Sequence, residues 1–93
     1  MIQSFKCKET AKLFDAGYSR KFPNSILKSA IIRLVMLNRS GKLDDLKIPP
    51  SNHLEKLSGD REGQYSIRIN NKYRVCFKWE VNNAYDVEIV DYH

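Results

Sequence analysis

The chain ends on Asp91-Tyr92-His93, a carboxylate, a phenol and an imidazole in succession. An imidazole can act as a base or an acid near neutral pH. A phenol, with an ordinary pKa of about 10, needs nearby positive charge to act as a base, but it can stack on a nucleobase as it stands. Asp91 can orient His93 or pair with an arginine. The alternative from the residues alone is a solvated chain end without a catalytic role.

Cations precede this ending at alternating positions. Arg68, Arg74 and Lys78 occupy polar positions of two segments in which apolar and polar residues alternate. Cleavage of RNA through its 2′-hydroxyl needs a base, positive charge on the phosphorane and a proton donor for the departing 5′ oxygen. The arginine fork suits the phosphate. We therefore expect a concave basic surface edged by the last residues, or else merely the solvated face of a sheet.

Alternation in the C-terminal third predicts the sheet that would position these groups. We expect strands at residues 64–69, 73–79 and 85–90, with tight turns at Asn70-Asn71 and Asn82-Asn83. Together they form an antiparallel meander with one covered face and one wet face. The residues predicted to point to the covered face are Tyr65, Ile67, Ile69, Tyr73, Val75, Phe77, Trp79, Tyr85, Val87 and Ile89.

The N-terminal half predicts the cover for this sheet. Residues 2–5 read as a short strand, residues 8–16 as a helix that stops at Gly17, and residues 26–39 as the strongest helix of the chain. Asn24 or Ser25 is expected to cap the second helix, and Ser40-Gly41 to end it. Apolar positions at helical spacing are Ala11, Phe14 and Tyr18 in the first helix, and Leu27, Ala30, Ile31, Leu34, Val35 and Leu37 in the second.

The resulting fold class is α+β, in the order β-α-α-β-β-β, with two N-terminal helices packed on one face of a small antiparallel sheet. Residues 42–51 are expected to be irregular because of Pro49-Pro50, and residues 53–57 to form a first sheet strand or the end of that loop. Nothing marks a second domain, so residues 1–93 are expected to form one domain.

Charge and cysteine usage restrict the class of function. Sixteen Lys and Arg against eleven Asp and Glu give a net charge of +5, which favours a polyanionic partner. Without a signal peptide or an apolar span in the sequence, we expect a cytoplasmic protein away from membranes. Cys7 and Cys76 are expected to be reduced thiols packed near the core, and Cys76 is disfavoured as a nucleophile because it lies in mid-strand with no His beside it. A metal site from His53, Asp91 and His93 is disfavoured because nothing local enforces its geometry.

Several stretches resemble the HigB toxins of bacterial toxin-antitoxin systems, within the RelE/ParE superfamily. They are GDREG at residues 59–63, YSIRI at 65–69 with YRVCF at 73–77, EIVDYH at 88–93, and the start at residues 2–5. The resemblance covers nearly the whole chain, and the terminal DYH is its most specific part. It implies a compact microbial ribonuclease-like fold.

The resemblance also implies an activity: ribosome-dependent cleavage of mRNA in the ribosomal A site, which inhibits translation and uses neither cofactor nor metal. By position, Arg74 matches the family's phosphate-contacting arginine. Asp91, Tyr92 and His93 match its C-terminal catalytic cluster. His93 is the first candidate for the general base.

Upstream, the correspondence is weaker. Family members often place a Lys directly before the Gly-Asp-Arg and a His three residues earlier, where this chain has Ser58 and Glu55. His53 and Lys56 keep that spacing two residues earlier, and a shift of two preserves the face of a strand. His53 is therefore a second candidate base, and Lys56 a candidate RNA contact.

Toxins of this kind are normally held by a HigA-like helix-turn-helix antitoxin, through which the complex reaches operator DNA. The toxin itself would then face the ribosome, its rRNA and the mRNA in the A site. Candidate RNA-binding residues are Lys56, Arg61, Arg68, Lys72 and Lys78, with Arg20 and Lys21 in addition. The alternative function is that of ParE-type relatives, which inhibit a protein target such as DNA gyrase without catalysis and have no need of Arg74 and the DYH ending.

Overall fold

The computed structural model describes residues 1–91, so Tyr92 and His93 lie outside the described residues. Two α-helices, α1 (Lys8–Ala16) and α2 (Asn24–Arg39), precede the 3₁₀ helices η1 (Leu43–Lys47) and η2 (Pro50–Asn52). The sheet follows, with strands β1 (Glu55–Lys56), β2 (Gln64–Arg68), β3 (Tyr73–Glu80) and β4 (Asn83–Asp91), and the 3₁₀ helix η3 (Gly59–Arg61) between β1 and β2. Neighbouring strands are antiparallel, in the spatial order β1-β2-β3-β4.

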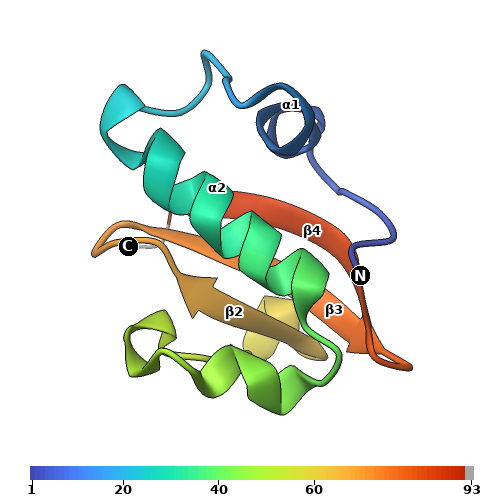
Figure 1. Ribbon diagram of the computed structural model, residues 1–93. Helices are drawn as coiled ribbons and strands as arrows, with labels where there is room; N and C mark the ends of the chain where they lie inside the picture. Colours follow the sequence, from blue (N-terminus) through green and yellow to red (C-terminus); the bar gives the residue numbers. More distant parts are fainter. Residues whose placement is uncertain (92–93) are drawn as a thin grey trace.

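Both α-helices lie over the same face of the sheet (Figure 1), which confirms the predicted α+β class. The core between the two layers takes Ile67, Val75, Phe77, Val87 and Ile89 from the strands. The residues facing them from the helices are Leu13, Ile26, Ala30, Leu34 and Leu37. Neither helix among residues 1–91 combines the length and the apolar character that crossing a bilayer requires.

The helix boundaries are close to those predicted, but the buried stripes differ. Tyr18 is 50% exposed instead of buried, because α1 ends at Ala16 and the chain turns through Gly17 in the left-handed conformation, φ 79°. In α2 the buried stripe starts at Ile26 and continues every three or four residues, which leaves Val35 exposed. The predicted cap is also wrong: Pro23 occupies the N-cap position, and no side chain caps this end.

A bulge in β4 corrects the predicted faces of the last strand. The register between β3 and β4 shifts between Cys76 and Lys78, and Asp86 has a positive φ of 52°. An extra residue in one strand inverts the alternation beyond it. Ala84, opposite Trp79, is therefore the buried residue. Tyr85 pairs with Lys78 and, contrary to the prediction, does not point to the helices.

Both predicted turns are close to their observed places. In the first, the Asn70 side chain accepts hydrogen bonds from the N–H groups of Lys72 and Tyr73, each at 2.8 Å. The second turn is one residue earlier than predicted, at Val81 and Asn82, whose φ angles are 47° and 64°. A two-residue hairpin loop in a type I′ turn requires positive φ at both loop residues, as found here.

Hydrogen bonds from the N-terminal segment run along the outer edge of β4. Residues 2–5, predicted to be a strand, form two isolated parallel bridges, Ile2 with Ala84 and Phe5 with Val87. Further along, the Ile89 N–H donates to the buried Thr10 hydroxyl oxygen at 3.1 Å. Because Ile89 is two residues before Asp91, this contact fixes the end of β4 that leads into the terminal residues.

The connection from α2 to the sheet is more ordered than predicted. Residues 42–51 contain η1 and most of η2 rather than irregular chain. Asn52 is fully buried, and its side-chain amide donates to the Leu46 carbonyl at 3.0 Å. This hydrogen bond anchors the chain directly before His53 and β1.

We expect Thr10→Val to lower the free energy of unfolding by about 1–3 kcal/mol, because the buried Ile89 N–H would lose its acceptor. Urea denaturation monitored by circular dichroism measures this difference. Thr10→Ser, which keeps the hydroxyl, should retain more of the stability than the isosteric valine variant. Equal stability of Thr10→Val and the wild type would show that the contact is not needed.

Candidate active site

The candidate site lies on the face of the sheet that the α-helices leave uncovered. Glu55, Ser66, Cys76 and Glu88 form a row across the four strands, since each is the register partner of the next. This face was predicted to be wet, yet Ser66 and Cys76 are fully buried. The reason is that arginine side chains lie across the middle of the row.

Arg74 is the first of these arginines and, among the predicted site residues that the structure describes, the best fixed. Its Nε donates to Ser66 Oγ at 2.8 Å, and its guanidinium donates to the His53 carbonyl at 2.6 Å. A carboxylate oxygen of Glu55 lies 3.7 Å from another guanidinium nitrogen. The Arg74 side chain is only 11% exposed, so it leans over β2 toward β1. Contacts of this kind hold a guanidinium in one orientation, as phosphate recognition requires.

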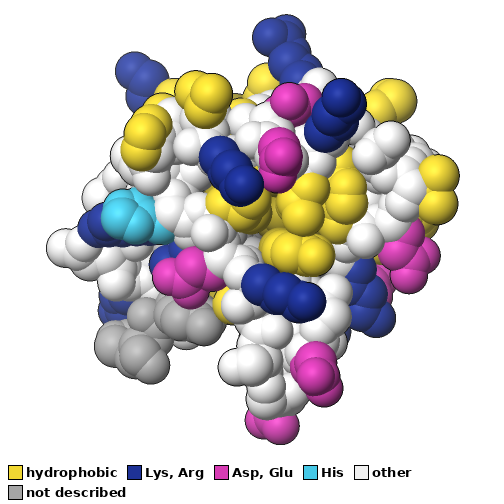
Figure 2. All heavy atoms as spheres, turned by 90° about the horizontal axis from the view of Figure 1, so that it is seen from below, with side chains coloured by type: hydrophobic (Ala, Val, Ile, Leu, Met, Phe, Trp, Pro, Cys, Tyr) yellow, Lys and Arg dark blue, Asp and Glu magenta, His cyan; other side chains and the backbone are white. Residues whose placement is uncertain are grey.

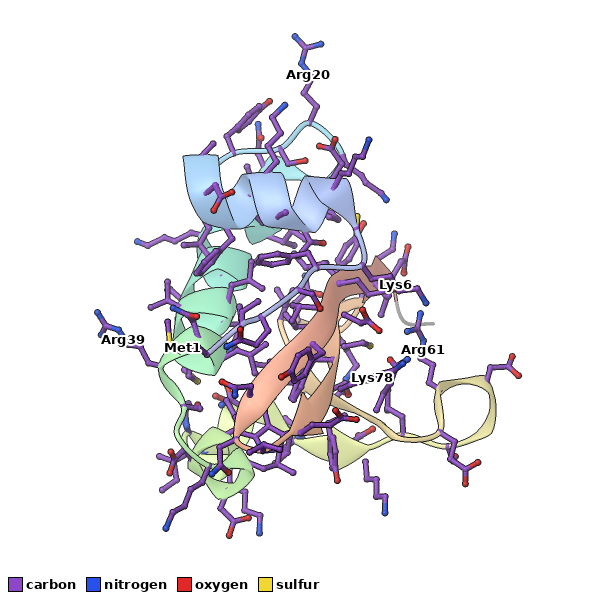
Figure 3. All side chains as sticks on the ribbon, turned by 90° about the vertical axis from the view of Figure 1, so that its right-hand side faces the viewer. Met1, Lys6, Arg20, Arg39, Arg61 and Lys78 are labelled. Atoms are coloured by element: carbon purple, nitrogen blue, oxygen red, sulfur yellow. The ribbon has the colours of Figure 1, made fainter. Side chains whose placement is uncertain are left out.

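A second cationic group surrounds Glu88. Arg61 lies 3.1 Å and Lys6 3.6 Å from the Glu88 carboxylate, which is only 14% exposed. Figure 3 shows Lys6, Arg61 and Lys78 on the same side of the molecule, the side away from the helices. Arg61 was a predicted RNA contact, whereas Lys6 was missed. The position of Lys6 follows from the parallel bridges between the N-terminal segment and β4, and no local sequence pattern predicts these bridges.

The other predicted RNA contacts are spread over the surface. Lys78 pairs with Asp86 at 3.3 Å, and Lys72 with Asp91 at 3.8 Å. Arg68 hydrogen-bonds Asn71 in the adjacent turn. Seen from the η1 and η2 end, Lys and Arg side chains alternate with Asp and Glu around a hydrophobic group (Figure 2). Positive charge is therefore not continuous at the η1 and η2 end of the molecule.

Three of the predicted RNA contacts lie apart from Arg74. Lys56 is the register partner of Tyr65, so it points to the opposite face of the sheet from Arg74. Arg20 projects beyond α1 at the far end of the molecule from Arg61 and Lys78 (Figure 3). Its neighbour Lys21 lies 3.6 Å from the Cys7 sulfur.

The structure brings His53 to Arg74 through its backbone carbonyl, while its side chain is exposed. His53 does not share a strand face with Arg74 as predicted, because β1 contains only Glu55 and Lys56 and His53 lies outside it, with φ 44°. Glu55, which the prediction did not include, is the β1 residue on the face of Arg74. No local pattern indicated this, since β1 is too short to show alternation.

The end of β4 lies beside Arg74. Val90 is the register partner of Arg74, and Asp91 is the partner of Tyr73. Asp91, a member of the predicted cluster, is the last residue of β4 and pairs with Lys72. Tyr92 and His93, the other two members, lie outside the described residues. Among residues 1–91, no three His, Cys, Asp or Glu side chains are grouped so as to hold a metal ion.

The two cysteines have opposite electrostatic environments. Burial raises the pKa of the Cys76 thiol, which lies under the arginines of the uncovered face. Cys7 is partly exposed at the start of α1. Burial, although slight, raises the pKa of the Cys7 thiol. Hydrogen bonds from Thr10 and Glu9 and the charge of Lys21 outweigh this effect, so the pKa of the thiol is lowered. Cys76 is therefore a protonated core thiol at neutral pH, as the sequence suggested.

We expect iodoacetamide at pH 7.5 to modify Cys7 at least about tenfold faster than Cys76 in the folded protein, because the thiolate is the reactive form and Cys7 is accessible. Mass spectrometry of timed samples measures both rates, and unfolding in urea should remove the difference. The rate at Cys7 should reach half its maximum at a lower pH than that of a free cysteine. Equal labelling of both thiols in the native state would contradict the burial of Cys76.

Comparison with known proteins decides the family. The sequence profile of the family described as "RelE-like toxin of type II toxin-antitoxin system HigB" matches residues 3–93. The chain belongs to this HigB family of toxins. It is thus a RelE-like toxin of a toxin-antitoxin system, as the terminal DYH and the GDREG stretch indicated.

Individual relatives agree with this assignment. The toxin is 36% identical over 80 residues to Toxin HigB-1 of Vibrio cholerae, covering 85% of the chain and 84% of the relative. It is 31% identical to Endoribonuclease HigB of Proteus vulgaris over the full length of both chains. The YoeB-YefM complex of Staphylococcus aureus contains a chain of the same fold, with a TM-score of 0.61 and 19% identity, covering 100% of the toxin and 98% of that chain.

Proposed function

We propose that this toxin is an endoribonuclease that cleaves mRNA in the ribosomal A site and so inhibits translation. The observation that carries the proposal is the fixed Arg74 guanidinium on the uncovered face, beside the strand end that leads into Asp91-Tyr92-His93. Family membership and the name Endoribonuclease HigB of the Proteus vulgaris relative support it. Action on the ribosome would place the toxin in the cytoplasm.

In this proposal, Arg74 supplies positive charge to the phosphorane that forms when the 2′ oxygen attacks phosphorus. His93 transfers a proton at one side of the reaction, Tyr92 stacks on a base or hydrogen-bonds the phosphate, and Asp91 orients His93. The reaction then has a cation, proton-transfer groups and no step that needs a metal or cofactor. His53, held at its carbonyl by Arg74, lies at the border of this site.

The proposed partners follow from the same reading. Arg61, Lys78 and the newly identified Lys6 lie on the catalytic side and would contact rRNA or mRNA. Arg68, the last residue of β2, is the register partner of Arg74, and Lys72 lies in the turn that follows. Lys56, Arg20 and Lys21 would contact RNA only at the margins. A HigA-like antitoxin would hold the toxin and carry the operator contact, and complexes such as YoeB-YefM support an antitoxin partner.

Mapping mRNA 5′ ends after expression of the toxin tests the proposal. We expect new ends within translated codons, and their loss when initiation is blocked so that mRNA is not on ribosomes. Purified toxin with programmed ribosomes should give the same cuts, and free mRNA should remain intact. Intact transcripts together with failed DNA supercoiling or replication would instead indicate a ParE-like inhibitor of a protein target such as gyrase.

We expect Arg74→Ala to lower the cleavage rate on programmed ribosomes by about 10² or more, since one transition-state charge contact is lost. Single-turnover kinetics measure the effect. Arg39→Ala is a matched control, because Arg39 projects from the end of α2 on the side of the molecule opposite to Arg61 and Lys78 (Figure 3). This variant should leave the rate unchanged. A wild-type rate in Arg74→Ala would show that this arginine only supports the fold.

We expect Tyr92→Ala and deletion of His93 each to abolish toxicity while the melting temperature stays close to that of the wild type. The reason is that β4 supplies the core through Ile89, upstream of both residues. Growth after induction and thermal unfolding measure the two properties. Full toxicity of both variants would remove the DYH ending from the mechanism.

A further inference from the structure

We propose that Glu55 is the general base that accepts the proton of the attacking 2′-hydroxyl. The inference rests on the proposed RNA cleavage and assigns a catalytic role to a residue that was not among the candidates, although it stands where family members often have a His. Its basis is the position of the Glu55 carboxylate in β1, 3.7 Å from the Arg74 guanidinium and on the same face of the sheet.

The distance between the two groups matches the reaction. In a reactive conformation the 2′ oxygen lies about 3–3.5 Å from the phosphorus that it attacks. A base for that oxygen and a cation for the phosphorane must therefore be neighbours. Glu55 and Arg74 are such a pair, because register places Glu55 opposite Ser66, and Ser66 accepts the hydrogen bond that turns Arg74 toward β1.

The Glu55 carboxylate is also accessible to a substrate. Its side chain is 52% exposed, and its 3.7 Å separation from Arg74 is beyond hydrogen-bonding range. Glu88, in the same row, is 14% exposed and held by Arg61 and Lys6, so it acts as an anchor for these cations. Asp86 pairs with Lys78 at the bulge. Of these three carboxylates, Glu55 is the one placed to accept a proton at the Arg74 phosphate position.

The step balances without a further reactant. The O2′–H bond breaks and its proton moves to the Glu55 carboxylate, while the 2′ oxygen forms a bond to phosphorus. The P–O5′ bond then breaks, and the 5′ oxygen takes a proton from the imidazolium of His93. The products are a 2′,3′-cyclic phosphate and a 5′-hydroxyl, and this division of roles makes His93 the acid.

Single-turnover cleavage of mRNA on programmed ribosomes tests the assignment. We expect Glu55→Gln to lower the rate by about 10²–10⁴, the usual contribution of a general base. Glutamine has nearly the same shape and keeps an oxygen facing Arg74, so a carboxylate that merely positioned Arg74 would be replaced with little loss. Glu80→Gln, an exposed and isosteric change at the far end of β3, should leave the rate unchanged.

The pH profile supplies a second readout that a structural role would not move. In Glu55→His an imidazole replaces the carboxylate as base, and imidazoles titrate near pH 6.5, well above ordinary carboxyl groups. The rate of Glu55→His divided by that of the wild type should therefore increase several-fold between pH 5.5 and 7.5. This ratio cancels the ionisation of groups that both proteins share, including His93.

The outcomes separate the two proposals. Cleavage by the wild type with an unchanged rate in Glu55→Gln overturns the role of Glu55 alone. A flat ratio for Glu55→His, together with substantial activity of that variant, does the same. If the wild type cleaves no RNA on ribosomes, the proposed function fails and the base assignment fails with it. Circular dichroism and melting temperatures confirm that each variant is folded.

Discussion

The orientation of Arg74 is the constraint on which the uncovered face depends. Its guanidinium joins β3 to Ser66 on β2 and to the backbone of His53, a residue 21 positions earlier in the chain. A largely buried cation requires partners of this kind, because removing an unpaired charge from water is costly. The Ser66 hydroxyl, the His53 carbonyl and the Glu55 carboxylate meet that requirement, and they also align the group for one direction of approach.

The same constraint explains why the face opposite the helices is only partly wet. A small antiparallel sheet can leave one face to water, yet here the row through Ser66 and Cys76 is covered by arginine side chains. Long cationic side chains can cover apolar surface with their stems while their charged ends stay polar. Arg61 and Arg74 thus give a 93-residue chain a second, thin layer of buried contacts.

Placement of the chain end depends on a different set of contacts. β4 is an edge strand, and exposed edges are open to unwanted pairing. The bridges from residues 2–5 and the Thr10 hydroxyl occupy that edge up to Ile89. The bulge at Asp86 then sets which side chains face the helices beyond it. The start of the chain therefore helps to position the end, where the chemistry is proposed.

Local pattern in the sequence was enough for the fold class, both helices, the antiparallel meander and the place of Arg74 on the face opposite the helices, because helical and strand periodicity and turn residues act over short distances. It was also enough for the family, through GDREG and DYH. It was not enough for the parity of Tyr85, which a bulge reverses, or for the burial of Ser66. Nor did it indicate Lys6 or Glu55, since their positions come from pairing between segments far apart in the chain. Which residues surround Arg74 is decided only when β1, β2 and β3 come together.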